Sequence, residues 1–387
     1  MIYLDNSATT KQYKQVTDVM VRHMDEIYGN PSSLYQLGVD SEKSIKNARK
    51  QLQDAMGLHD GKVYFTSGGT EADNTAIFGT AASLKRRGNR IITSKVEHPA
   101  VLECFKKLEQ QGFEAVYIDV DRNCRLNEDQ LEAAINEDTI LVSLMHVNNE
   151  AGTVMPVDKV KQIMKAKNAP GLFHCDAVQS FGKLPLCTSA DLVAVSGHKI
   201  HGPKGSGALY IEDKVNIQPF MVGGGQEEGK RSGTQNVPAI AGLGEAVELS
   251  EKSRVSDMAA ITVMRNYLMQ GLQDNLKDII INSPMEAGTE AGMCCPSLLN
   301  VTFMGTRGEV LLHTLEQDGI FVSTGSACSS NKKGQSHVLK AMGLKDKEIE
   351  GTLRFSLGRF NSMDEMDTVI ERVSAAVKRF RKLGSFR

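Results

Sequence analysis

The chain has 387 residues, a formal net charge of −2 and 41% hydrophobic residues. So small a net charge creates no strong field for nucleic acid or an anionic membrane, and no apolar run is long enough to cross a bilayer. A chain of this length does not usually fold around a single small hydrophobic core, so we expect two domains. Residues 1–5 lack the basic region and apolar run of a signal peptide, which predicts a cytoplasmic protein.

Strand and helix patterns alternate along most of the chain. The pattern predicts strands at 90–95, 113–118, 140–147, 171–173 and 192–195, and helices at 101–111 and 157–167. This order predicts a mostly parallel sheet with helices on both faces. A helical stretch at 240–276, strands at 279–281, 298–303 and 353–356, and a closing helix at 363–381 predict a second, smaller unit.

A lysine and an aspartate follow two of these strands. Lys199 comes after the apolar run 192–195 and the small residues Ser196 and Gly197. A lone lysine is usually solvated, but its amine can also form an imine with an aldehyde cofactor. Asp176 ends an earlier strand, where a side chain points into the ligand crevice of an α/β protein. A carboxylate there could keep the ring nitrogen of pyridoxal phosphate protonated.

Two more strand ends carry polar residues. Residues 65–74 run from a strand through Gly68 and Gly69 into a helix, as a phosphate site requires. The alternative is an ordinary helix start with Thr70 as N-cap. His98 follows the strand at 90–95, with Pro99 in the first turn of a helix. The histidine is either structural or placed to stack on an aromatic cofactor ring.

One cysteine lies in a segment of small residues. Cys328 is flanked by Gly, Ser and Ala over 323–330, which predicts an exposed, movable thiol suited to nucleophilic attack or sulfur transfer. The chain has seven cysteines and none in a CxxC spacing, so the sequence predicts neither a disulfide framework nor a metal site. We interpret the adjacent Cys294 and Cys295 as structural. Cys175 precedes Asp176 directly and is expected to face away from the cofactor.

These motifs together resemble the NifS/IscS-like cysteine desulfurases, of the class V aminotransferase group and fold-type I pyridoxal phosphate enzymes. The matching segments follow the family order over nearly the whole chain. They are residues 3–10, 29–33, 66–74, 97–98, 148–152, 176–179, 196–207, 223–227, 231–234, 323–329 and 354–358. The distance from Cys328 to the motif at 336–339 resembles the long-loop branch rather than the short-loop, SufS-like branch.

The resemblance implies a pyridoxal 5'-phosphate site. Lys199 would hold the cofactor covalently as an aldimine and then shuttle protons, Asp176 would pair with the pyridinium nitrogen, and His98 would stack on the ring and assist proton transfer. The other implied cofactor contacts are Gly69, Thr70, Asn149, Gln179, Ser196, His198 and, from the second subunit of a homodimer, Thr234. The implied fold is a large domain with a mostly parallel sheet plus a smaller α+β domain.

The resemblance also implies the reaction. L-cysteine would be converted to L-alanine, with Cys328, Lys199 and His98 as the catalytic residues and Cys328 carrying the sulfur as a persulfide. Arg354 and Asn149 would bind the substrate, because the planar guanidinium suits a carboxylate. Sulfur acceptors for iron–sulfur cluster assembly, tRNA thiolation or cofactor biosynthesis would be the partners, with no direct nucleic-acid or membrane contact.

Three points stay open at this level. The expected domains are residues 13–255, which bind the cofactor, and a discontinuous unit of 1–12 and 256–387, which carries the cysteine segment. Tyr35 stands where many relatives have histidine. Other class V enzymes, such as a selenocysteine lyase or an aminotransferase, and a non-catalytic binding protein are the alternatives. Cys328 disfavours the aminotransferase, and the joint presence of Lys199, Asp176 and Cys328 disfavours the binding protein.

Overall fold

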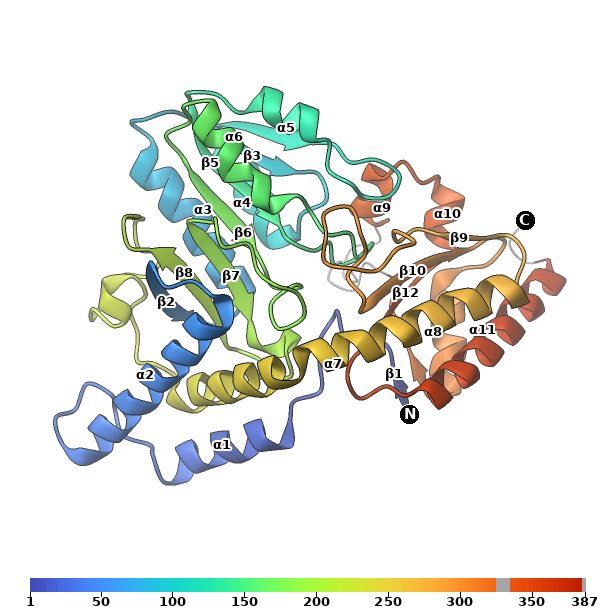
Figure 1. The fold of residues 1–387 in the computed structure, drawn as a ribbon, viewed down its shortest axis with the longest axis horizontal. Helices are drawn as coiled ribbons and strands as arrows, with labels where there is room; N and C mark the ends of the chain where they lie inside the picture. The colour runs from blue at the N-terminus through green and yellow to red at the C-terminus, as the bar shows by residue number, and fades with distance from the viewer. Residues whose placement is uncertain (325–334, 385–387) are drawn as a thin grey trace.

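The computed structural model describes residues 1–324 and 335–384, so Cys328 lies outside the described residues. A seven-stranded sheet forms the larger part (Figure 1), in the order β2-β8-β7-β6-β5-β3-β4. In this sheet β8 runs opposite to the other six strands, which are parallel to one another, so the predicted mostly parallel sheet is confirmed. The strands are β2 (Gly61–Thr66), β3 (Arg90–Ser94), β4 (Glu114–Ile118), β5 (Thr139–Met145), β6 (Leu172–Asp176), β7 (Leu192–Ser196) and β8 (Gly207–Glu212).

Helices cover both faces of this sheet. On one face, α3 and α4 pack against the strands. The small, apolar residues of α3 and the apolar residues of α4 form two hydrophobic clusters with the sheet. The other face carries the largest cluster, to which the remaining helices contribute. The helices are α1 (Lys14–Asp25), α2 (Gln36–Met56), α3 (Gly69–Leu84), α4 (Pro99–Glu109), α5 (Glu128–Ala134), α6 (Val160–Ala166) and α7 (Val237–Asn275).

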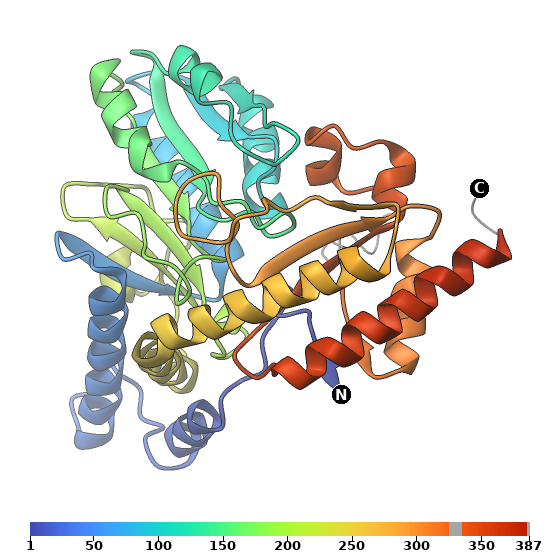
Figure 2. The same ribbon diagram turned by 45° about the vertical axis from the view of Figure 1, so that its right-hand side comes forward.

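A smaller α+β unit packs beside the large sheet. Its antiparallel sheet has the order β12-β10-β9, and the first strand of the chain pairs in parallel with β11. Figure 2 shows α7 and α11 lying along one another on this unit. Its elements are β1 (Ile2–Tyr3), β9 (Ile279–Ile281), β10 (Leu298–Phe303), α8 (Gly308–Gln317), β11 (Ile320–Phe321), α9 (His337–Ala341), α10 (Asp346–Glu350), β12 (Thr352–Ser356) and α11 (Met363–Leu383).

The helix α7 joins the two units. Its first half, with Val237 and Leu243, packs into the core of the large sheet, and its second half, with Leu268, packs into a separate core that also holds Leu4. These two cores support the predicted domain division, which stays a prediction. Residues of α9 and α10 such as Leu339 pack into the large core instead, so the C-terminal region also contacts the cofactor-binding part.

Most predicted elements exist, with shifted ends. The helix predicted at 157–167 is divided into a 3₁₀ turn, Val157–Lys159, followed by α6. The helix predicted at 101–111 begins earlier, because Pro99 occupies its first turn. The helices α1 and α2 were not predicted from the sequence. Among the described residues, no helix combines the length and apolarity needed to cross a membrane.

Candidate active site

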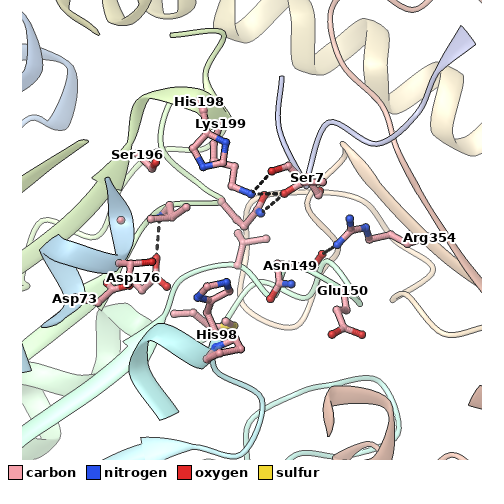
Figure 3. Close-up of a pocket in the computed structure, with 18 of the residues that line it drawn as sticks. Ser7, Asp73, His98, Asn149, Glu150, Asp176, Ser196, His198, Lys199 and Arg354 are labelled. Carbon is pink, nitrogen blue, oxygen red and sulfur yellow. Dashed lines mark hydrogen bonds between the residues drawn. The ribbon is translucent and has the colours of Figure 1, made fainter. Parts of the chain in front are cut away.

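A cavity of about 270 Å³ opens at the carboxyl ends of the parallel strands (Figure 3), where an α/β sheet binds ligands. Ten of the predicted site residues line it. They are Gly69, Thr70, His98, Asn149, Asp176, Gln179, Ser196, His198, Lys199 and Arg354. Residues more than 280 positions apart in the chain therefore line the same pocket. The positions at strand ends predicted only some of these residues.

Asp176 is the last residue of β6, at the floor of the pocket. The backbone N–H of Val178 donates to its Oδ1 at 2.9 Å. Burial raises the pKa of the carboxyl group to about 6, while this N–H and the nearby Lys199 act in the opposite direction. Cys175 packs into the large core and does not line the cavity, as the alternation of a strand requires.

Lys199 ends the 3₁₀ turn Gly197–Lys199 directly after β7. Its Nζ donates to the carbonyl oxygens of Ser7 and Ala8, at 2.5 and 2.9 Å. The N-terminal segment thus contacts Lys199 and fixes the position of its amine. Sequence reasoning did not assign Ser7 or Ala8 to the site, although the motif at 3–10 contains both.

The N-terminus of α3 faces the pocket beside Ser196 and His198. Its N-cap is Gly68 and no side chain caps it, so the alternative that Thr70 serves as an ordinary N-cap is wrong. A Cβ on Gly69 would lie 2.7 Å from Cγ2 of Val178, so only glycine lets the turn pack this closely. The first N–H groups of α3 can therefore bind an anion together with nearby hydroxyl groups.

His98 is the N-cap of α4. Its Nδ1 accepts a hydrogen bond from the N–H of Ala100 at 3.2 Å, so Nδ1 carries no proton. Burial, followed by the positive charge of Lys199, lowers the pKa of His98 to about 4. The ring is therefore neutral at neutral pH, and a neutral, flat imidazole can lie against an aromatic cofactor.

Arg354 reaches the pocket from β12. Its Nη1 donates to the carbonyl oxygen of Asn149 at 2.8 Å, and its Nη2 lies 2.7 Å from Oδ1 of Asp5. The Nε atom is buried and has no hydrogen-bond partner among the described residues. Gln179 donates from Nε2 to the carbonyl oxygen of Ser7 at 3.0 Å. Asp5 does not line the cavity itself, and its contact with Arg354 was not predicted from the sequence.

Both flanks of the segment 325–334 are attached near the pocket. On one side, Ser323 and Arg354 exchange backbone hydrogen bonds. On the other, Ser336 Oγ donates to Glu150 Oε2 at 2.6 Å, and His337 Nε2 donates to the carbonyl oxygen of Glu97 at 2.9 Å. Ser336, His337 and Glu150 line the cavity. Sequence reasoning missed these roles, for which the motif at 336–339 was the available signal.

One predicted site residue that the structure describes does not line the cavity, and a second cannot be placed relative to it. Thr234 is exposed and does not line it, and Cys328 lies outside the described residues. Cys294 and Cys295 are fully buried in a small apolar cluster, which agrees with a structural role. Within residues 1–324 and 335–384, no group of three metal-ligating side chains is found.

The chemistry of the cavity fits pyridoxal phosphate. Buried polar atoms with no partner among the described residues include Ser7 Oγ and Arg354 Nε, which indicates that a polar ligand belongs here. A helix N-terminus suits a phosphate, Lys199 an aldehyde, and Asp176 a protonated ring nitrogen.

The comparisons with known proteins agree with this geometry. Residues 2–369 match the family model described as aminotransferase class-V. The chain belongs to the class-V aminotransferase family. A curated relative named cysteine desulfurase IscS, from Methanosarcina thermophila, is 43% identical over 99% of this chain and 93% of its own.

Solved structures of this family show the same fold. One described as a NifS-like protein has a TM-score of 0.90 and 36% identity, and the match covers 98% of this chain and 99% of the other. A structure described as SspA in complex with cysteine has a TM-score of 0.79 and 33% identity over 94% of this chain and all of the other. The chain therefore has the fold-type I architecture expected of a pyridoxal-phosphate-dependent class-V enzyme.

Proposed function

We propose that this protein is a pyridoxal-phosphate-dependent cysteine desulfurase that converts L-cysteine to L-alanine and keeps the sulfur as an enzyme persulfide. The observation that carries the proposal is the meeting of Lys199, Asp176 and Arg354 in one pocket. These side chains supply an amine for the aldehyde, a carboxylate for the ring nitrogen and a cation for the amino-acid carboxylate. Full-length relatives named cysteine desulfurase, and a similar structure described as holding cysteine, support this substrate.

The residues around the pocket would hold the cofactor as follows. Lys199 Nζ would carry the covalent link, Asp176 would pair with the ring nitrogen, and His98 would lie against the ring. Asn149 and Gln179 would hydrogen-bond near its phenolic oxygen. Gly69, Thr70, Ser196 and His198 would bind its phosphate. When bound, pyridoxal phosphate supplies an aldehyde carbon that captures an amine and a ring that accepts electrons from the α-carbon.

Lys199 and Arg354 would then act on the substrate. Arg354 is held by Asn149 and Asp5, and its unpartnered Nε would donate to the cysteine carboxylate, with Asn149 nearby. When it does not carry the covalent link, Lys199 Nζ would be the base that takes the α-proton of the substrate. His98 is neutral and can take or return a second proton.

The sulfur step requires a thiolate, for which we propose Cys328. Its sulfur would attack the substrate sulfur, so that an S–S bond forms and the substrate C–S bond breaks. The electrons of that bond stay with carbon, which takes up a proton and leaves as part of alanine. The flanks at Ser323 and Ser336 lie beside the pocket, which supports this role. Only the thiolate is a strong nucleophile.

We also propose three features of its working context. A second copy of the chain would supply Thr234 to the phosphate, because Thr234 is exposed and lies outside the cavity of its own chain. Acceptor proteins, such as an iron–sulfur scaffold or a tRNA-thiolation protein, would receive the persulfide sulfur. The reaction would take place in the cytoplasm.

The test is production of alanine and sulfide from L-cysteine by cofactor-loaded protein with a thiol reductant. We expect the wild type to release both in equal amounts and Cys328→Ala to lose this activity. Cys104→Ala is the matched control, because Cys104 is buried in the core on α4 and is not assigned to the reaction. Loaded protein that forms no alanine would contradict the function, and an active Cys328→Ala variant would contradict the role of Cys328.

A further inference from the structure

A second carboxyl group lies at the pocket floor beside Asp176 (Figure 3). Asp73, on α3, lines the cavity and is only 1% exposed. Its Oδ1 lies 3.5 Å from Nε2 of His174. Neither atom has a hydrogen-bond partner elsewhere among the described residues. The mechanism proposed above uses neither side chain, so two buried polar groups that face each other need an explanation.

The position of His174 follows from the sheet. It precedes Asp176 by two residues on β6, so both side chains point to the face covered by α3, while Cys175 points to the opposite face. On the neighbouring strand β5, Ser143 pairs with His174 in register, and its Oγ lies 2.9 Å from Nδ1. The imidazole is therefore fixed between a hydroxyl group and the carboxyl group of Asp73.

Two arrangements place the proton between Asp73 and His174 on opposite partners. His174 is completely buried, which lowers its pKa to about 3, so the ring is neutral and carries one N–H. In the first arrangement Nδ1–H donates to Ser143 and Nε2 accepts from a protonated Asp73. In the second, Ser143 donates to Nδ1 and Nε2–H donates to an ionised Asp73. The first is uncharged, and the second places a full negative charge in the interior.

The surroundings favour the uncharged arrangement. The titratable groups that act on Asp73 are Asp176 from β6 and Glu97 from the connection between β3 and α4, and both raise its pKa, as burial does more strongly. Cys104 on α4 faces Asp73 as a neutral thiol. A second carboxylate next to Asp176 would suffer both desolvation and like-charge repulsion.

We propose that Asp73 is a neutral carboxylic acid that donates its proton to Nε2 of His174, and that this pair leaves Asp176 as the one carboxylate at the floor for the cofactor's ring nitrogen. Asp73 and His174 are thus positioning residues. The neutral acid occupies space beside Asp176 without competing for a cation. The role of this pair toward the cofactor's ring nitrogen rests on the proposed function. The protonation state of Asp73 does not depend on that function.

Infrared spectroscopy of protein labelled with ¹³C in the aspartate carboxyl groups tests the protonation state directly. At about pH 8, far above the ordinary pKa of aspartic acid, we expect one band of a protonated carboxyl group in the wild type. Asp73→Asn should remove this band, and Asp176→Asn should retain it. Absence of the band from the wild type, or its persistence in Asp73→Asn, would overturn the proposal. Because this test needs no turnover, its failure is distinct from failure of the desulfurase assay.

A second measurement uses only the intact sequence, so it does not depend on a variant that folds. In ¹⁵N-histidine-labelled wild-type protein, the Nε2 resonance of His174 should be that of an unprotonated, hydrogen-bonded nitrogen, and Nδ1 should carry the proton. The spectrum of His174→Gln assigns the signal. A proton on Nε2 would show that Asp73 accepts from His174 instead of donating to it, and would overturn the proposal.

The cofactor-loaded protein gives a third readout. Asp73→Asn exchanges a neutral acid for a neutral amide, so the pH at which the bound cofactor's visible absorption changes should stay the same. If Asp73 is ionised in the wild type, the exchange removes a negative charge and moves that pH. An unchanged pH therefore supports a neutral Asp73, and a shifted pH contradicts it.

Discussion

Nη2 of Arg354 lies 2.7 Å from Oδ1 of Asp5, although 349 residues separate the two along the chain. The side chain of Arg354 is only 3% exposed, so this is a largely buried charge pair. Together with the bond from Nη1 to the carbonyl oxygen of Asn149, it fixes one edge of the guanidinium and leaves Nε directed to other partners. The segment that follows β1 thereby orients the residue proposed to bind the substrate carboxylate.

Replacing Asp5 with asparagine should raise the KM for L-cysteine by about fivefold while changing kcat less, because the misoriented fork weakens ground-state binding. Removing the charged partner of Arg354 should also lower the free energy of unfolding by about 2 kcal/mol, since Asp5 is only partly buried. Steady-state kinetics and urea unfolding measure both. Glu350→Gln, which breaks the exposed pair with Arg307, is the control and should change neither. An unchanged KM in Asp5→Asn would contradict the orienting role.

Lys199 should be the attachment point of the cofactor, because its Nζ is held in the cavity by Ser7 and Ala8. Reduction of the loaded protein with borohydride, followed by peptide mass analysis, should place the cofactor on the peptide that contains residue 199. Lys199→Ala should carry none. Lys183 is the control lysine, because it donates to Gln179 from outside the cavity lining, and Lys183→Gln should still be labelled. Label on any other lysine would refute the assignment.

The strand-end pattern predicted Asp176, Lys199 and His98, because these residues follow apolar runs whose ends meet at one edge of a parallel sheet. It could not predict Ser7, Ala8 or Asp5, because their contacts lie about 190 to 350 positions away and leave no local periodicity. The Asp73–His174 pair escaped detection for a related reason. A histidine inside an apolar strand and an aspartate inside a helix each have an ordinary local explanation, and only the packing of α3 on β6 brings them together.

His146 should make the protein less stable in acid. Burial lowers its pKa to about 4, below the value in the unfolded chain, so the unfolded state binds the additional proton. The stability linked to this group is present above about pH 6.5 and is lost as the pH falls toward 4. Between pH 7 and pH 5, the free energy of unfolding of His146→Gln should therefore fall by about 2 kcal/mol less than that of the wild type. Urea unfolding at the two pH values measures this, with His59→Gln at an exposed position as the control. Equal losses in His146→Gln and the wild type would exclude the linkage.

Ser336 should matter to the sulfur step more than to cofactor binding. It donates to Glu150 at 2.6 Å and also caps α9 by accepting from the N–H of Leu339, so it anchors the chain next to the segment with Cys328. Ser336→Ala should cost about 1–2 kcal/mol of stability and lower kcat several-fold, with cofactor affinity unchanged. Asn127→Ala removes a comparable N-cap hydrogen bond, from the N–H of Gln130, at the start of α5 outside the cavity lining, and should lower stability without changing kcat. Equal kcat values in both variants would show that the anchor has no part in the reaction.

Thr234 should act on the cofactor of the other subunit. Its hydroxyl group is exposed on its own chain, and Thr234→Ala should weaken cofactor affinity by about tenfold, as expected for loss of one hydrogen bond to a charged group. Mixed dimers show whether Thr234 contacts the cofactor site of its own chain or that of the other subunit. A dimer of wild type with the double variant Lys199→Ala/Thr234→Ala has one intact lysine, and that site should show the weakened affinity. A dimer of Lys199→Ala with Thr234→Ala should retain full affinity at its one lysine, because the Lys199→Ala chain supplies an intact threonine. The opposite pattern would place Thr234 in the site of its own chain.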